Sequence, residues 1–203
     1  MGRFENTLET RGFMEFARKP ELEGQHAFLS PSGYHWVNYS YEKLKERFTA
    51  AMAAKHGTEL HAFAHEAVRL GIKLPKTQKT LNLYVNDVIG YKMSSEVPLY
   101  YSENCFGHAD AISFRNNKLR ISDLKTGVTK ASHIQLEIYA ALFCLQYSVD
   151  PYDIIIELRI YQNNEINFYE PSSEQISIIM DKIVDFDLKI EEFKHGGFYN
   201  GNS

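Results

Sequence analysis

The stretch GHADAISFRNNKLRISDLKTG, residues 107–127, constrains the fold of this 203-residue chain more than any other segment. Apolar and polar residues alternate on both sides of Asn116-Asn117, a pair that favours a tight turn. The segment is therefore predicted to be a β-hairpin. Asp110 lies six residues before Asn116 and Asp123 lies six residues after Asn117, so antiparallel pairing brings the two carboxylates side by side.

The half of the chain before this hairpin is predicted to be mainly helical. Ser40 can cap a first, Ala-rich helix, Gly57 can end it, and Thr58 can then begin a second helix. The predicted helices cover residues 41–57, 58–71 and 81–93. Trp36, the only tryptophan, lies between Ser, Pro and Gly breaks, in an ordered loop or a short helix over residues 29–40.

Strands and helices alternate after residue 96. The patterns predict strands over 97–103, 152–162 and 165–171, and helices over 132–147 and 172–193. This order is typical of an α/β fold in which helices flank a small mixed β-sheet. We expect one domain over residues 1–203, made of a mainly helical N-terminal part (1–96), a part with the sheet and a core helix (97–170), and a C-terminal helix (171–194).

Composition excludes several classes of protein. No apolar run approaches the roughly 20 residues of a membrane span, and the first residues, MGRFENTLETRGFMEF, lack the apolar core of a signal peptide. We therefore expect a cytoplasmic protein without a membrane partner. Cys105 and Cys144 are too few for an iron–sulfur cluster and are expected to be free thiols. The net charge of −4 gives no general reason for nucleic-acid binding, although a local basic groove would suffice.

Asp110, Asp123 and Lys125 form a candidate catalytic group. Two carboxylates opposite each other are destabilising unless a cation compensates, and hard oxygen ligands suit Mg²⁺ or Mn²⁺. Lys125 follows two residues after Asp123, so both side chains point to the same face of the strand. An ammonium there can orient an attacking water and stabilise charge on a phosphate. The alternative is a surface hairpin whose two solvent-facing acids have a lysine neighbour.

The motifs GHAD, ISDLKTG and QLEIYAALF occur in an order that resembles the PD-(D/E)xK nuclease superfamily, in its RecB-type exonuclease branch. This branch includes RecB-like exonuclease domains, CRISPR adaptation nucleases and phage-encoded relatives. The resemblance covers roughly residues 57–162 and implies a restriction-endonuclease-like core within a single nuclease domain.

The resemblance implies a set of metal ligands. Members of the branch carry a metal-binding histidine in a GTxxH context on a helix before the core, which corresponds to GTELH and His61. The Gly-x-x-Asp motif corresponds to Asp110, and the Asp-x-Lys motif to Asp123 and Lys125. In this superfamily the carbonyl at the position of Leu124 commonly ligates the metal. The expected cofactor is Mg²⁺ or Mn²⁺.

The same resemblance implies the remaining catalytic residues. Lys125 is expected to position the attacking water. Gln135 and Tyr139, from a Gln-x-x-x-Tyr motif, lie one helical turn apart and are expected to line the site, where they contact DNA or support Lys125. Taken without the resemblance, they are polar tips on a core helix, and Glu137 is expected on its solvent side.

Several other residues have two interpretations. His108 can be a ligand, a DNA contact or a spectator. His65, on the helical face of the predicted metal-binding histidine, and Glu66 can support the metal or serve only the fold. Trp36 and Tyr34 can stack on a base or close the core. A set of lysines and tyrosines can line a DNA path or form a solvated face: Lys73, Lys76, Lys79, Lys92, Tyr84 and Tyr91.

The sequence thus predicts a metal-dependent DNA exonuclease of recombination, repair or phage DNA processing. Its expected partner is DNA, as linear or single-stranded ends, in company with a recombinase, a single-strand-binding protein or a helicase. The chain lacks a helicase motif and the four cysteines of many relatives, so any motor is a separate protein. An oligomer is compatible with the sequence.

Two alternatives stay open at this point. One is a structure- or sequence-selective endonuclease that uses the same site. The other is a catalytically silent DNA-binding module that kept the fold, against which the complete metal and lysine motifs argue.

Overall fold

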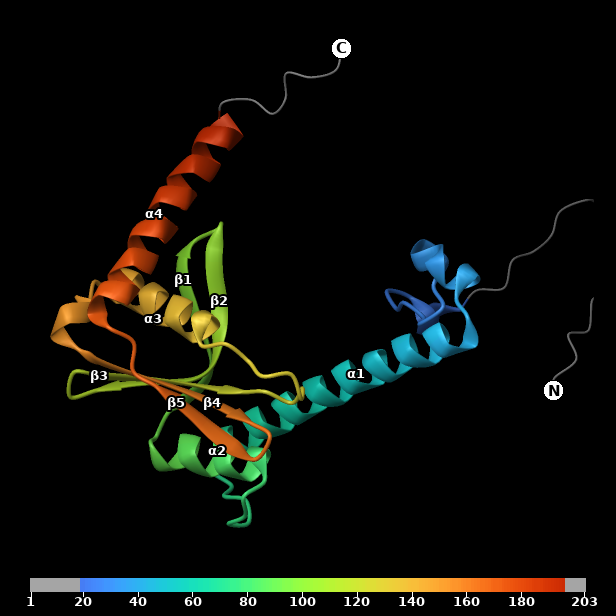
Figure 1. Ribbon diagram of the computed structural model, residues 1–203, viewed down its shortest axis with the longest axis horizontal. Coiled ribbons are helices and arrows are strands. Elements are labelled where there is room, and N and C mark those ends of the chain that lie inside the picture. The colour runs from blue at the N-terminus through green and yellow to red at the C-terminus, as the bar shows by residue number, and fades with distance from the viewer. Residues whose placement is uncertain (1–18, 196–203) are drawn as a thin grey trace, which may run out of the picture. The chain divides into compact units, whose positions relative to one another are not determined.

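The computed structural model describes residues 19–195 (Figure 1). The chain divides into two compact units, residues 1–50 and 51–203. The expected organisation, one domain over residues 1–203 with internal parts that meet near residues 96 and 170, stays a prediction. Every predicted catalytic or metal-binding residue lies in the second unit.

The first unit contains two 3₁₀ helices, η1 (Pro20–Leu22) and η2 (Pro31–Asn38), and the start of the long helix α1 (Tyr41–Arg69). The indole of Trp36 donates a hydrogen bond to the carbonyl of Ser30, at 2.9 Å, and the ring is half-buried. Trp36 therefore stabilises the entry to η2, while Tyr34 is 63% exposed.

The second unit is built on one mixed sheet of five strands in the order β1-β2-β3-β4-β5. Antiparallel pairing joins every neighbouring pair except β3 and β4, which are parallel. The strands are β1 (Ser94–Ser102), β2 (Cys105–Arg115), β3 (Lys118–Leu124), β4 (Ile155–Gln162) and β5 (Glu165–Tyr169). The predicted α/β fold with a mixed sheet flanked by helices is confirmed.

Asparagine pairs form the tight turns between β2 and β3 and between β4 and β5. Asn116 and Asn117, between β2 and β3, have φ values of 50° and 55°, and the turn between β4 and β5 also has two asparagines at positive φ. Asparagine tolerates this left-handed conformation better than most residues. The predicted hairpin over residues 107–127 is therefore confirmed. The strand before it, β1, begins at Ser94, three residues earlier than expected.

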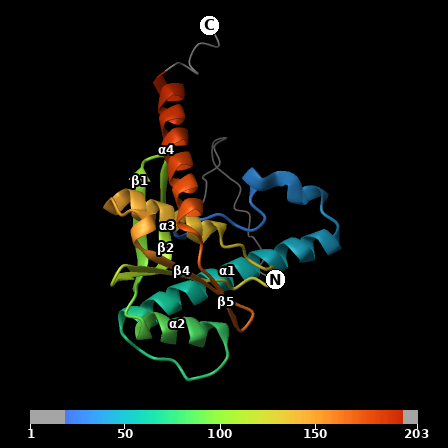
Figure 2. The same ribbon diagram turned by 60° about the vertical axis from the view of Figure 1, so that its left-hand side comes forward.

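Helices cover both faces of the sheet, as Figures 1 and 2 show. On one face, α3 (Ile134–Tyr147) and α4 (Ser173–His195) share a buried apolar cluster with the sheet, which includes Leu119, Ile121 and Leu158. On the other face, α2 (Thr80–Gly90) and the C-terminal part of α1 share a second cluster that includes Leu124 and Tyr161. A short 3₁₀ turn, η3 (Pro151–Asp153), precedes β4. The end of β3 lies between these two apolar layers.

Gly57 does not end a helix, contrary to expectation, because α1 continues through it without interruption. A Cβ atom at this position would lie 2.7 Å from Oγ1 of Thr126, which is closer than real Cβ contacts. The glycine instead allows α1 to approach the segment that follows β3. A glycine in the middle of a helix costs about 1 kcal/mol relative to alanine, so this close approach has a measurable cost.

Two predictions about exposure are wrong. Glu137 is only 6% exposed, because α3 packs against both α4 and the sheet. Tyr84 is 3% exposed, with its ring edge-on to that of Tyr161, so it lies in the core and lines no DNA path. Cys105 and Cys144 are free, as expected. Among residues 19–195, no helix is long and apolar enough to cross a membrane.

Candidate active site

Asp110 and Asp123 lie where β2 and β3 separate. The β2–β3 ladder runs from Arg115 and Lys118 to Ala111 and Ser122 and stops there. Beyond this point β2 continues only with β1, and β3 continues with β4. The carboxylate of Asp110 reaches across the opening and accepts a hydrogen bond from the backbone N–H of Leu124, at 2.9 Å. Asp110 on β2 and Asp123 on β3 therefore lie at neighbouring positions of the two strands, as predicted.

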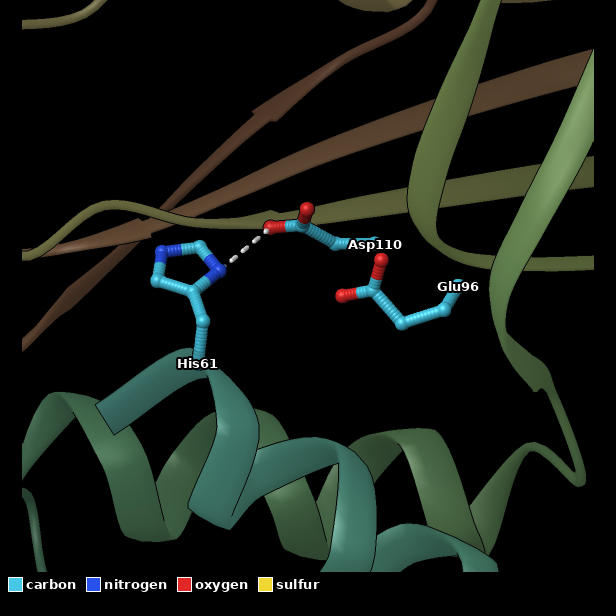
Figure 3. Close-up of side chains that lie close together, drawn as sticks. All are labelled: His61, Glu96 and Asp110. Carbon is cyan, nitrogen blue, oxygen red and sulfur yellow. Dashed lines mark ion pairs between the residues drawn. The ribbon is translucent and has the colours of Figure 1, made fainter. Parts of the chain in front are cut away.

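His61, Glu96 and Asp110 form a compact cluster (Figure 3). One potential ligand atom from each residue lies within 4.8 Å of the others. Nδ1 of His61, on α1, is 3.5 Å from Oδ2 of Asp110. The structure thus brings together two of the predicted ligands and adds Glu96, which the sequence analysis missed.

Glu96 lies opposite Asp110 across the β1–β2 pair, since Ser95 faces Ala111 and Val97 faces Ala109. Its φ of 53° is unusual for a glutamate and costs backbone energy. A two-residue turn at 103–104 would by itself have paired Glu96 with Ala111. The register shift between Tyr100 and Ser102 moves the pairing by one residue and places Glu96 opposite Asp110. Nothing in the sequence indicated this shift, and the strand was predicted to start one residue after Glu96.

A second group extends from Asp123 to α3. Nζ of Lys125 donates hydrogen bonds to Oδ1 of Asp123, at 3.0 Å, and to Oε1 of Gln135, at 2.9 Å. The amide of Gln135 in turn donates to the hydroxyl of Tyr139, at 3.2 Å. The ring of Tyr139 lies against Gly107, where a Cβ atom would be 2.9 Å from it. The four predicted residues therefore form one chain of contacts, and Gly107 provides the space for its last member.

Asp123 is the least satisfied polar residue of the site. Its side chain is 5% exposed, and its Oδ2 is the one buried side-chain oxygen or nitrogen in residues 19–195 without a hydrogen-bond partner. Burial raises the pKa of Asp123, and the neighbouring Asp110 raises it further, while Lys125 opposes this effect. A carboxylate with an unsatisfied buried oxygen costs free energy unless a cation or donor occupies the adjacent space.

Asp110 has a similar electrostatic environment. Burial raises the pKa of its carboxyl group, and Glu96 adds to the effect. The N–H of Leu124 and the imidazole of His61 partly offset these contributions. Both aspartates are therefore held in surroundings that disfavour their charged forms, as is common where a protein prepares carboxylates for a cation.

The donor set fits a hard divalent cation. One imidazole and two carboxylates meet in the cluster, the buried Asp123 lies next to Asp110, and oxygen donors are the ligands that Mg²⁺ and Mn²⁺ prefer. The orphaned Oδ2 of Asp123 and the two raised aspartate pKa values are what such a cation would relieve. Leu124 packs its side chain into the core, and ligation by its carbonyl stays a prediction.

Other predicted residues lie outside this group. Nδ1 of His65 is 2.9 Å from the hydroxyl of Ser95, so His65 holds α1 against the strand residue next to Glu96. Glu66 forms an exposed ion pair with Arg69. His108 is exposed on β2.

The lysines and tyrosines that the sequence suggested as a DNA path differ in exposure. Lys73, Lys76, Lys79 and Lys92 are exposed, which fits either a DNA path or a solvated face. The ring of Tyr91 instead lies under the guanidinium of Arg120, 3.8 Å from its centroid, and is engaged in the fold.

No family model matches the chain, and no curated protein matches it significantly. A functional proposal therefore depends on the geometry of the site and on the motifs in the sequence.

Proposed function

We propose that the protein is a metal-dependent deoxyribonuclease that hydrolyses phosphodiester bonds from DNA ends. The observation that carries the proposal is the buried Asp123, whose Oδ1 binds Lys125 and whose Oδ2 has no partner, next to the cluster of His61, Glu96 and Asp110. A fold that needed only stability would not retain several acids around one opening, because mutual repulsion and desolvation both oppose folding.

The metal would be held by His61, Glu96 and Asp110, whose donor atoms cluster, together with Asp123, whose Oδ2 has no partner. When bound, Mg²⁺ or Mn²⁺ supplies Lewis-acid activation of a phosphate oxygen and of water. The remaining chemistry belongs to the chain itself. His65 and the N–H of Leu124 fix the positions of α1 and Asp110, so the acids need not reorganise when substrate arrives.

Lys125 is the residue that we assign to the transition state. Its ammonium is held by Asp123 and Gln135, and its side chain is 31% exposed, so one side remains accessible to substrate. A held cation can orient the attacking water and stabilise the charge that develops on the phosphate, without spending free energy on its own ordering. Removal of such a group typically costs a factor of about 100–1,000 in turnover.

DNA as the substrate and action at ends are supported by the resemblance of the ordered motifs to RecB-type nucleases. The sheet with helices on both faces is compatible with the restriction-endonuclease-like core that this resemblance implies. The net charge of −4 means that DNA contacts must be local. Exposed lysines on the 73–79 segment are candidates for such contacts.

The test is cleavage of end-labelled linear DNA and of covalently closed circular DNA, each with Mg²⁺, Mn²⁺ or EDTA. We expect metal-dependent shortening of the linear substrate alone. Asp123→Ala and Lys125→Ala should abolish it while they keep the thermal unfolding cooperative. Lys189→Ala is the matched control, because Lys189 is an exposed lysine on α4 whose surface ion pair contributes little.

Each arm of this experiment has a distinct meaning. Cutting of the circle would replace the exonuclease by an endonuclease at the same site. Wild-type cleavage by Lys125→Ala would remove Lys125 from the proposed mechanism. Tight DNA binding with no cleavage in either metal would favour the catalytically silent module.

A further inference from the structure

A pocket of about 370 Å³ lies beside the candidate active site. The residues at the end of β3, Leu124 to Thr126, form one wall, and they follow Asp123 directly. The other walls come from α1, the start of α2 and the β4–β5 turn. The lining consists of His56, Leu60, Thr80, Leu81, Leu124, Lys125, Thr126, Asn163 and Asn164.

The β4–β5 turn and the start of α2 hold each other through paired hydrogen bonds. The backbone N–H of Thr80 donates to the side-chain oxygen of Asn164, at 3.0 Å, and the N–H of Asn164 donates back to the hydroxyl of Thr80, at 2.7 Å. The amide of Asn163 donates to the carbonyl of Val128, at 3.2 Å. Two walls of the pocket are therefore fixed before any ligand binds.

Gln162 fixes the segment that follows Lys125 in the chain, residues 127–131. Its side-chain amide donates to the carbonyls of Gly127 and Thr129, at 2.6 and 2.8 Å, and its oxygen accepts from the N–H of Ala131, at 3.0 Å. This side chain is 9% exposed, so its three hydrogen bonds are largely protected from water. A pocket with preformed walls binds without the entropic cost of ordering them.

The lining is suited to a flat, uncharged group with a polar edge. Leu60 and Leu81 provide apolar surface, while the side-chain oxygen of Asn163 and the side-chain nitrogen of Asn164 are not used in the hydrogen bonds that fix the walls. No carboxylate is among the lining residues. A nucleobase combines an apolar face with hydrogen-bonding edges, and its linked phosphate would lie towards the ammonium of Lys125.

The size and chemistry of the pocket favour one base over a base pair. Ligand pockets commonly have volumes of about 300–1,000 Å³, so this one is at the small end. A base pair is about twice the size of a base, and pairing occupies the edge that the asparagine amides would recognise. A base could enter only if it is unpaired.

We propose that this pocket holds one unpaired nucleoside of a DNA strand, next to the phosphate that Lys125 faces. The inference rests on the proposed function and extends it, because it assigns a binding site for one base beside Lys125. A duplex would have to open at its end before the strand could be cut.

The test measures binding in EDTA, where no cleavage is expected, by fluorescence anisotropy. The probes are a fluorescein-labelled oligothymidylate of 12 nucleotides, an abasic strand with the same number of phosphates, and the duplex of the first probe. We expect the oligothymidylate to bind about tenfold more tightly than the abasic strand and the duplex, because one base contact of about 1.4 kcal/mol corresponds to this factor. Equal affinity for the first two probes would overturn the inference.

Two matched substitutions locate the effect. Leu60→Trp fills the pocket and should remove the difference between oligothymidylate and abasic strand. Leu70→Trp changes the same residue type just after α1, outside the pocket lining, and should keep the difference. Persistence of the full difference in Leu60→Trp would show that the bases bind elsewhere and would refute the inference.

Thermal unfolding is measured for both variants. Should Leu60→Trp fail to fold, His56→Ala at the exposed side of the lining provides the same comparison. We expect it to weaken oligothymidylate binding about threefold and leave the abasic strand unchanged, and no change in either would count against the pocket.

The two proposals can fail separately. Metal-dependent cleavage without a base contribution to binding would leave the nuclease and remove the pocket. A base contribution that depends on Leu60, with no cleavage in Mg²⁺ or Mn²⁺, would keep a single-strand site and remove the nuclease.

Discussion

Gly57→Ala tests whether α1 is held close to the end of β3, one helical turn before His61. An added Cβ atom would lie 2.7 Å from Oγ1 of Thr126, and the next nearest atom, Cβ of Thr126, would be 3.8 Å away. The first distance requires a shift, whereas the second is an ordinary contact. Thr126→Ala therefore removes the clash and leaves the rest of the contact.

The expected energies follow from these two distances. Alanine in the interior of a helix is about 1 kcal/mol more favourable than glycine, and forcing an extra methyl group into a packed contact costs about 1–3 kcal/mol. Gly57→Ala alone should thus destabilise the protein by about 1 kcal/mol. In the Thr126→Ala background it should stabilise the protein by about 1 kcal/mol, so the coupling energy is about 2 kcal/mol.

The assay is thermal unfolding of the wild type, both single variants and the double variant. A coupling of this size corresponds to about 4–8 °C in the midpoint for a chain of this length. Gly90→Ala is the control, because no atom lies within 4 Å of a Cβ at that helical position and the effect should be equal in both backgrounds. If Gly57→Ala has the same effect with and without Thr126, α1 does not pack there and the placement of His61 is wrong.

Two further predictions concern the acids and the motif glycine. Asp123→Asn should raise the metal-free midpoint at pH 7 by about 2–4 °C. The raised pKa of Asp123 means that the folded state binds its proton more tightly. The contribution of this carboxyl group to stability is therefore fully present below the usual aspartate range and is lost as pH rises through the raised pKa. The variant should lack this fall with pH and lose the stabilisation by Mn²⁺, and a larger fall with pH in Asp123→Asn would contradict this reasoning. Gly107→Ala should move the ring of Tyr139, because the added Cβ would be 2.9 Å from it. We expect turnover to fall about tenfold with little change in KM. In the Tyr139→Phe background the hydroxyl no longer links to the chain of hydrogen bonds, so Gly107→Ala should cause no extra loss in turnover.

Local patterns were sufficient to predict much of the site. The turn at Asn116 and the alternation beside it fixed the register that places Asp110 and Asp123 at one opening. A spacing of two along a strand then put Lys125 beside Asp123, and a spacing of four along a helix put Gln135 beside Tyr139. Such periodicities depend only on backbone geometry, which every strand and helix shares.

Contacts between distant segments were not predictable in this way. Gly57 looked like the end of a helix, because nothing near it in the sequence reveals that Thr126 approaches it. Glu137 looked solvent-facing, because the covering of α3 depends on where α4 packs. Glu96 lay one residue outside the predicted strand, and its role depends on its position opposite Asp110.

The sequence alone determined the α/β class, the hairpin and the order of the candidate catalytic residues, because these follow from local periodicity and turn preference. Only the tertiary structure decided which acids share one opening, which carboxylate oxygen is left without a partner, and where a nucleoside-sized pocket forms. Those features arise from the packing of segments far apart in the chain, and packing depends on the shapes of both partners rather than on either segment alone.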